Sequence, residues 1–382
     1  MRIYLDHNAT TPVREEVAAA MIRVLRDVPG NPSSVHAEGA RARAELDTAR
    51  ERVAALLEVS PSEVVFTAGA TEANNTALAA VAAARPDGRR HVVATAVEHP
   101  SVDTALDDLA ARGHPVTRVP VGRGGRVDAA AVAGALRDDT ALVSVIWANN
   151  ETGVLQPVES IAELARARGA WMHSDATQAV GKHAIRPGRL PIDLLSLSAH
   201  KFGGPKGVGC LVVRGAIAVP PLLRGGPQEK RRRGGTENVA GIAGLGVACE
   251  LARRELPERV ARYARLRDRL WDGIAAKVPR VVRNGDPEHV LANTLNVTFC
   301  DTPGELLLQA LDLGGIAASA GAACASGSIE PSHVLVAMGF SGADARATLR
   351  FSVGHDTDES SIDRVLALLP DLVARAREAG DA

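Results

Sequence analysis

Short runs of consecutive apolar residues alternate along the first 250 residues with longer segments whose apolar residues recur every three to four positions. The short runs predict strands and the longer segments predict helices. The predicted strands are 64–67, 92–96, 142–147, 171–173, 194–197 and 208–213, and the predicted helices include 38–57, 70–84 and 161–167. Near-continuous apolar strands separated by helices are typical of parallel strands that are buried on both faces. The pattern therefore predicts an α/β domain with a mostly parallel sheet flanked by helices.

The pattern changes near residue 250. Residues 250–277 predict a long charged helix, with Pro257 marking a kink or a start. Shorter strands at 294–299 and 348–353 follow, separated by helical segments. We expect a large domain at 13–255 and a smaller α+β domain formed by 1–12 together with 256–382.

Polar residues follow several of the predicted strands. They are Glu98–His99, Asn149–Asn150, Asp175 and His200–Lys201. In an open α/β sheet, ligands bind at the carboxyl ends of the strands. We therefore expect these side chains to converge on one site.

Lys201, Asp175 and the turn at 67–72 together match the needs of pyridoxal 5'-phosphate (PLP), although each of the three has a common alternative. Lys201 directly after a buried strand suits Schiff-base chemistry, but most lone lysines simply reach solvent. Asp175 could pair with a pyridinium nitrogen, or it could cap the following segment. The turn at 67–72 precedes a helix whose first N–H groups could bind a phosphate, but many such turns look alike.

Composition excludes several other classes. The 44 basic and 45 acidic residues give a net charge of -1, which argues against nucleic-acid binding driven by bulk charge. No apolar run reaches the roughly 18 residues that a membrane span needs, and the N-terminal residues lack the apolar core of a signal peptide. The four cysteines form no C-x-x-C pair. We expect a reduced, cytoplasmic protein without direct contact to nucleic acid or membrane.

Ten segments, in the same order and over most of the chain, resemble cysteine desulfurases of the NifS/IscS type, which belong to the class V aminotransferases and have the fold-type I PLP fold. The segments are YLDHNATTP (4–12), GNPSSVH (30–36), VVFTAGATEANN (64–75), VEHPSV (97–102), VSVIWANNETGVLQP (143–157), HSDATQAVGK (173–182), SLSAHKFGGPKGVG (196–209), PLLRGGPQEKRRRGGTEN (221–238), GIAASAGAACASGSIEPSHVL (315–335) and LRFSVG (349–354).

The resemblance implies a role for each matching residue. Lys201 would form the Schiff base with PLP, Asp175 would pair with the ring N–H, and Gln178 would hydrogen-bond the phenolic oxygen. His99 would stack on the ring and move protons. The residues expected at the phosphate are Ala70, Thr71, Ser198 and His200, with Thr236 reaching the phosphate of the partner subunit in a homodimer. Asn150 and Arg350 would hold the substrate carboxylate.

Cys324 would be the nucleophile that takes the sulfur of L-cysteine as a persulfide and passes it to an acceptor protein. It lies in GAACASGS, a glycine- and alanine-rich stretch with little to bury, whereas Cys210, Cys249 and Cys300 are expected to be structural. Relatives usually carry Ser, Ser and Thr at the positions of Ala320, Ala322 and Ala325, and Gly at the position of Ala199, directly before the His–Lys pair. These departures put turnover and acceptor preference in doubt.

The sequence thus predicts a PLP-dependent desulfurase that supplies sulfur for iron–sulfur clusters, tRNA or DNA modification. The alternatives within the family are a selenocysteine lyase and another class V aminotransferase, and a plain aminotransferase has no need of Cys324. A catalytically silent scaffold would not be expected to keep both Lys201 and Cys324. A dinucleotide-dependent dehydrogenase lacks its G-x-G-x-x-G motif here, and the eleven histidines form no H-x-x-x-H pair for a metal.

Overall fold

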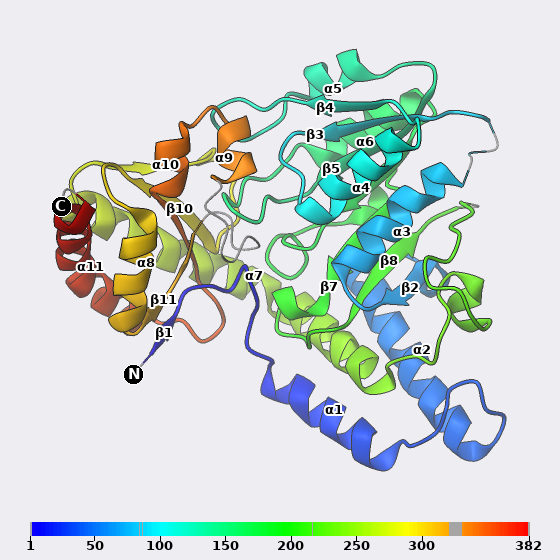
Figure 1. Cartoon of the computed structure of the whole chain (residues 1–382). Coiled ribbons are helices and arrows are strands. Elements are labelled where there is room, and N and C mark those ends of the chain that lie inside the picture. Colours follow the sequence, from blue (N-terminus) through cyan, green and yellow to red (C-terminus); the bar gives the residue numbers. More distant parts are fainter. Residues whose placement is uncertain (1, 84, 86, 216, 321–330, 381–382) are drawn as a thin grey trace.

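A seven-stranded sheet forms the centre of the larger part of the molecule (Figure 1). The computed structural model describes residues 2–83, 85, 87–215, 217–320 and 331–380. In spatial order the strands are β2 (Val64–Thr67), β8 (Gly209–Val213), β7 (Leu194–Ser198), β6 (Trp171–Asp175), β5 (Thr140–Ile146), β3 (His91–Thr95) and β4 (Val116–Val119).

Both faces of this sheet are covered, which explains why its strands are apolar without interruption. On β5, Val143 and Val145 pack into one apolar core, while Leu142 packs into a second core on the opposite face. The second core lies under α3 and α4, and the first lies under α2, α6 and the start of α7. The helices of this part are α1 (Glu15–Asp27), α2 (Ala37–Leu57), α3 (Ala70–Ala82), α4 (Pro100–Ala111), α5 (Ala129–Ala135), α6 (Val158–Ala167) and α7 (Val239–Lys277).

One strand departs from the parallel arrangement. Strand β8 runs antiparallel to both of its neighbours, β7 and β2, whereas the other neighbouring pairs in the sheet are parallel. Only residues 199–208 connect β7 to β8, and a parallel return requires a crossover of a dozen or more residues. The sheet is therefore mixed and mostly parallel.

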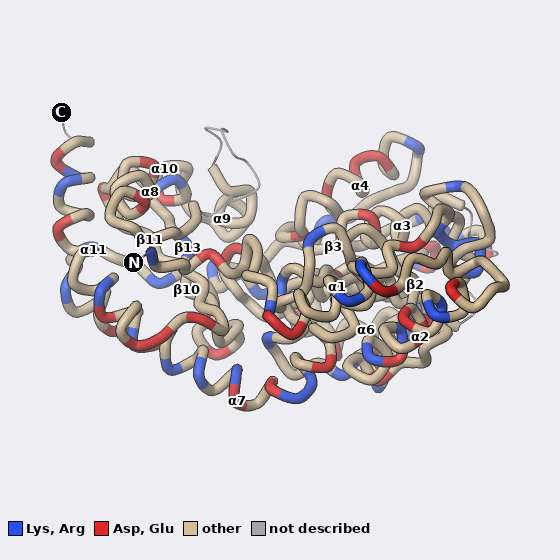
Figure 2. Tube along the Cα trace, turned by 90° about the horizontal axis from the view of Figure 1, so that it is seen from below, with Lys and Arg blue, Asp and Glu red and all other residues tan. Residues whose placement is uncertain are grey.

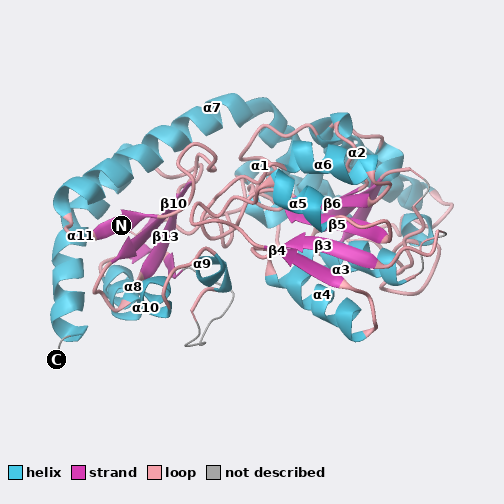
Figure 3. Cartoon of the chain, turned by 90° about the horizontal axis from the view of Figure 1, so that it is seen from above, coloured by secondary structure: helices cyan, strands magenta, loops and turns pink. Residues whose placement is uncertain are grey.

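The long helix predicted at 250–277 begins much earlier, at Val239, and Pro257 lies inside it rather than at its start. Figure 3 shows α7 running from the large sheet to the smaller part of the molecule. Basic and acidic residues alternate along α7 and α11 (Figure 2). None of the helices in the described ranges is long and apolar enough to cross a membrane.

The smaller part contains an antiparallel sheet with its own apolar core. The strands, in order, are β12 (Ser319–Ala320), β13 (Thr348–Ser352), β10 (Thr294–Phe299) and β9 (Val281–Arg283). A separate parallel pair joins β1 (Ile3–Tyr4) to β11 (Ile316–Ala317). The helices are α8 (Gly304–Leu313), α9 (His333–Ala337), α10 (Gly342–Arg346) and α11 (Glu359–Gly380).

The core of the smaller part and the largest core of the larger part draw on different stretches of the chain, which indicates where the domains divide. One core draws on residues 3 and 5 together with residues 263–376, and the largest of the others draws on residues 17–252 and 291. This distribution supports, as a proposal, a division into 13–255 and 1–12 with 256–382. Helix α7 would then be shared between both domains.

Candidate active site

A cavity of about 800 Å³ opens at the carboxyl ends of the strands, between the large sheet and β13. Its size is within the range of small-molecule sites. Ten of the twelve predicted site residues line it: Ala70, Thr71, His99, Asn150, Asp175, Gln178, Ser198, His200, Lys201 and Arg350. Thr236 is exposed and is not among the lining residues, and Cys324 lies outside the described residues.

Lys201 lies in a short 3₁₀ turn (Ala199–Lys201) directly after β7. Its ammonium nitrogen donates hydrogen bonds to the backbone oxygens of Asn8 (2.8 Å) and Ala9 (2.9 Å). The lysine therefore does not reach out to solvent, as most lone lysines do. The segment around Asn8 directs its amine into the cavity.

Asp175 ends β6 and is almost fully buried. Its Oδ2 accepts a hydrogen bond of 2.8 Å from the side chain of Asn74, and its Oδ1 accepts one of 3.0 Å from the backbone N–H of Thr177. The two sequence interpretations of this residue are therefore compatible, because it both supports the following turn and presents a carboxylate to the cavity. Asn74, on the buried face of α3, was not predicted as a site residue.

The first turn of α3 provides a site for an anion. The N–H groups at a helix start lack partners within the helix, and the dipole there favours negative charge. Ala70 and Thr71 form this turn, and Ser198 and His200 border the same cavity. Burial and the neighbouring lysines lower the pKa of His200 to about 4, so its ring is neutral at pH 7. This end of the cavity thus offers uncharged donors.

His99 caps the start of α4, with Pro100 at the first helical position. Its Nδ1 accepts a hydrogen bond of 3.1 Å from the backbone N–H of Ser101. The neutral ring must therefore carry its proton on Nε2. Burial lowers the pKa of His99, while the charge of Asp175 acts in the opposite direction. A neutral ring of fixed tautomer is suited to proton transfer.

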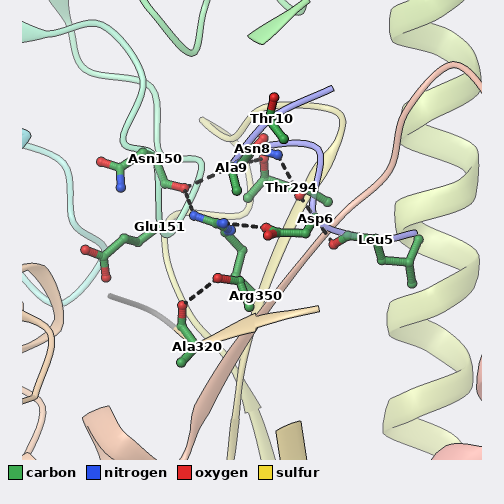
Figure 4. A network of polar contacts seen from close by, with 12 residues as sticks. Leu5, Asp6, Asn8, Ala9, Thr10, Asn150, Glu151, Thr294, Ala320 and Arg350 are labelled. Atoms are coloured by element: carbon green, nitrogen blue, oxygen red, sulfur yellow. Dashed lines mark hydrogen bonds and ion pairs between the residues drawn. The ribbon is translucent and has the colours of Figure 1, made fainter. Parts of the chain in front are cut away.

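Arg350, on β13, brings the smaller part of the molecule into the cavity (Figure 4). Its side chain is 1% exposed. One terminal nitrogen donates to the backbone oxygen of Asn150 (2.8 Å), and the other forms an ion pair with Asp6 (2.6 Å). Its buried Nε–H has no hydrogen-bond partner among the described residues. Arg350 thus places a positive charge at the wall of the cavity, and Asp6 is a partner that the sequence did not reveal.

Asn8 is a third residue, after Asn74 and Asp6, that sequence reasoning missed. Its side chain donates to Thr294 (2.9 Å) and to the backbone oxygen of Asn150 (3.3 Å), and its own backbone oxygen accepts from Gln178 (2.9 Å) as well as from Lys201. It lies within YLDHNATTP, one of the ten matching segments, which was the only available signal. No local pattern shows that an N-terminal asparagine reaches the ends of distant strands.

The chain on either side of residues 321–330 is fixed beside the cavity. Strand β12 pairs with β13, so that Ser319 lies opposite Arg350. On the other side, Ser332 donates to the buried carboxylate of Glu151 (2.5 Å), and the Nε2 of His333 donates to the backbone oxygen of Glu98 (3.0 Å).

The alanine departures are only partly within the described residues. Ala320 ends β12, whereas Ala322 and Ala325 lie outside the described residues. Ala199 is fully buried, and a Cβ at Gly204 would come within 2.7 Å of the Cβ of Ala199. The glycine at 204 thus makes room for the alanine at 199.

Comparison with known proteins identifies the family. The aminotransferase class-V model matches residues 3–365. The chain belongs to the class-V aminotransferase family. It is 46% identical to the cysteine desulfurase NifS of Azotobacter vinelandii over 376 residues, covering 98% of this chain and 93% of that protein. It is 43% identical to the cysteine desulfurase IscS of Methanosarcina thermophila, with the same coverage of both chains.

A solved NifS-like protein superposes with a TM-score of 0.92 at 36% identity, covering 98% of this chain and 100% of that one. Within the class-V family the chain groups with the desulfurases of the NifS/IscS type, and its fold is the fold-type I fold. The predicted family and fold are confirmed. The comparisons do not favour a selenocysteine lyase or another class V aminotransferase.

The cofactor of these class V enzymes is PLP, and the lining residues fit it chemically. The helix start at Ala70 suits its phosphate, and the carboxylate of Asp175 suits a protonated ring nitrogen. The amine of Lys201 enters the same cavity and suits its aldehyde. PLP thus meets complementary groups at three of its four polar positions, and Gln178 faces the cavity for the fourth.

Proposed function

We propose that this chain removes the sulfur of L-cysteine, releasing L-alanine and leaving a persulfide on Cys324. The observation that carries the proposal is the meeting of Lys201, Asp175, the start of α3 and Arg350 in one cavity. The first three provide for PLP, and the last provides for an amino acid. The identity to the NifS and IscS desulfurases supports L-cysteine as that amino acid.

The substrate carboxylate would bind at Arg350 and Asn150. The guanidinium of Arg350, which lines the cavity, would supply a charge-assisted hydrogen bond, and its burial would strengthen that bond. Asp6 and the backbone of Asn150 already hold the two terminal nitrogens, so that the guanidinium plane is fixed before substrate arrives. This arrangement selects an α-carboxylate by position as well as by charge.

Proton transfer would be divided between Lys201 and His99. When bound, PLP supplies an electron sink for the negative charge that develops at the substrate Cα. Lys201 would take the proton from Cα with its amine nitrogen, and Asp175 would keep the ring nitrogen protonated. His99, neutral and protonated on Nε2, can donate that proton to a basic atom in the cavity. Ala70, Thr71, Ser198 and His200 would bind the phosphate.

Cys324 would carry out the sulfur transfer. Its thiolate attacks the sulfur of the substrate, so that a sulfur–sulfur bond forms while the carbon–sulfur bond breaks. The electron pair of the broken bond stays on the substrate Cβ, which takes up a proton to become the methyl group of alanine. The anchored positions of Ala320 and Ser332 support this role, because they fix both ends of the segment that contains Cys324 beside the cavity.

We further propose a homodimer, with Thr236 reaching the phosphate in the partner subunit. Next to the exposed Thr236, the buried carboxylate of Glu237 has no hydrogen-bond partner among the described residues. Leu222 and Leu223, in the same loop, are large apolar residues that are exposed. A second subunit over this surface would cover both leucines and could supply the missing donor.

The acceptor of the persulfide would be a thiol of another protein in the reducing cytoplasm.

The experiment is to purify the protein, record its visible spectrum with PLP, add L-cysteine and measure alanine and the Cys324 persulfide. We expect Cys324→Ser to retain PLP and to lose both products. Cys300→Ser is the matched control, since Cys300 is half-buried at the end of β10 and should be dispensable. Alanine released at the wild-type rate by Cys324→Ser would refute the nucleophile. Visible absorbance of bound PLP retained by Lys201→Ala would refute the role of Lys201.

A further inference from the structure

Lys182 lies behind the cavity and takes no part in the functions assigned above. Its side chain is 3% exposed, and together with Lys201 it borders a small second cavity of about 20 Å³. Gly181 precedes it with φ of 74°, and a Cβ there would lie 2.7 Å from the Cβ of Phe202. This tight turn directs Lys182 into the interior, where burying an amine costs free energy unless it has hydrogen-bond partners.

The amine of Lys182 has two acceptors among the described residues. Its Nζ donates to Oε1 of Gln178 (2.5 Å) and to Oδ1 of Asn8 (3.1 Å). Burial holds the pKa of Lys182 well below its usual value; the charges of Lys201 and Arg350 lower it further, and Asp6 opposes them. A neutral amine has two N–H groups, which matches the two acceptors, whereas an ammonium would need a third.

Two contacts hold the Gln178 amide in one orientation. The backbone oxygen of Asn8 can only accept, so the Gln178 atom that lies 2.9 Å from it is the amide nitrogen. The amide oxygen therefore points towards Lys182, which donates to it. The second hydrogen is left for a ligand in the cavity that Gln178 lines.

We propose that Lys182 is a positioning residue that holds Gln178 with its amide N–H towards the cofactor, so that the cofactor meets a hydrogen-bond donor there. Only an acceptor atom, such as the phenolic oxygen of PLP, can use that donor. This inference rests on the PLP-binding part of the proposed function and not on the identity of the substrate.

Asn8, the second acceptor of Lys182, has several other partners. The Asn8 side-chain oxygen accepts from Lys182 and from Asn293 (3.0 Å), which leaves its amide nitrogen to donate to Thr294 and Asn150. The backbone oxygen of the same residue holds the amine of Lys201. Asn293, Thr294 and Asn150 keep Asn8 in place without Lys182, so that loss of the lysine amine acts on the cofactor through Gln178.

The test measures PLP affinity by titrating the PLP-free protein with PLP and following the visible absorbance of the bound cofactor. The variants are Lys182→Met, Gln178→Ala and the double variant. Methionine keeps the length of the side chain but removes its donors. Loss of one hydrogen bond to a charged or strongly polar oxygen corresponds to a decrease of about 10-fold in affinity, which we expect for each single variant.

If Lys182 acts through Gln178, the double variant should bind PLP no more weakly than Gln178→Ala alone. Wild-type affinity in Lys182→Met, or losses that multiply in the double variant, would overturn the inference.

Should Lys182→Met fail to fold, Gln178→Glu tests the same orientation, because it replaces the donor that faces the cavity with an acceptor. We expect it to lose at least as much affinity as Gln178→Ala, and unchanged affinity would overturn the inference. These readouts need only PLP binding. A wild-type protein that binds PLP but forms no alanine would refute the proposed function and leave the role of Lys182 standing.

Discussion

The hydroxyl of Ser332 donates a hydrogen bond of 2.5 Å to Oε2 of Glu151, joining the end of the Cys324 segment to the loop after β5. Glu151 is buried, which raises its pKa to about 7, while Ser332, His333 and Arg350 favour the charged form. The same serine oxygen accepts from the backbone N–H of Leu335 and caps α9. One hydroxyl thus connects the chain that carries the proposed nucleophile to Glu151, which directly follows the cavity-lining Asn150.

We predict that Ser332→Ala slows persulfide formation on Cys324 by about 10-fold and leaves PLP affinity unchanged. The reason is that the lost hydrogen bond to Glu151 positions the chain next to Cys324 and not the cofactor. Ser341→Ala is the matched control, since Ser341 caps α10 in the same way but is exposed and does not reach the cavity. Persulfide formation in Ser332→Ala as fast as in Ser341→Ala would contradict the prediction. Rapid-quench mass spectrometry of Cys324 provides the measurement.

Arg350→Lys should lower kcat/KM for L-cysteine by about 100-fold, mainly through KM. A lysine ammonium cannot hold Asp6, Asn150 and a carboxylate at once in the plane that the guanidinium provides. The paired control is Arg269→Lys, because Arg269 contacts Asp363 at the exposed surface, where such pairs contribute little. Steady-state alanine release gives both constants. An unchanged KM would remove Arg350 from the substrate site.

Glu98→Gln should become more stable relative to the wild type as the pH rises. Complete burial raises the pKa of Glu98 from 4.5 to about 8, so the folded protein binds this proton more tightly than the unfolded chain does. The wild type therefore loses stability between about pH 4.5 and pH 8, and the glutamine variant does not lose this contribution. Its amide oxygen can still accept from Thr95 and from the backbone of Ile146.

Thermal unfolding of both proteins at pH 5 and pH 8 provides the check. The Tm of the variant minus that of the wild type should be larger at pH 8 than at pH 5. An equal difference at the two pH values would mean that Glu98 does not titrate in this interval.

Secondary structure was predictable where one physical signal dominated. The apolar run at 142–147 predicted β5 because both faces of that strand are buried. By contrast, β4 was missed because it lies at the edge of the sheet, where its residues 116–118 are partly exposed and its two central residues, Thr117 and Arg118, are polar. The start of α7 was missed because residues 239–249 are mostly buried and carry no charged or polar side chain that would mark a solvent face.

The site residues likewise divide into those that a local pattern predicts and those that depend on distant partners. Lys201, Asp175 and His99 were predictable because polar residues at strand ends meet at one edge of a sheet. Asn74 and Asp6 could not be found by such reasoning, because their partners lie 101 and 344 residues away along the chain. No local pattern encodes a contact over such separations.

By itself, the sequence determined the class of fold, the family and the cofactor, and it predicted most of the site residues that line the cavity, because these follow from strand periodicity and from motifs that are contiguous in the chain. Tertiary structure alone decided that β8 runs antiparallel, that Asp6 holds Arg350, and that Lys182 contacts Asn8. These features depend on which buried donors and acceptors come within hydrogen-bonding distance. That distance is set by the packing of the two cores and not by any segment alone.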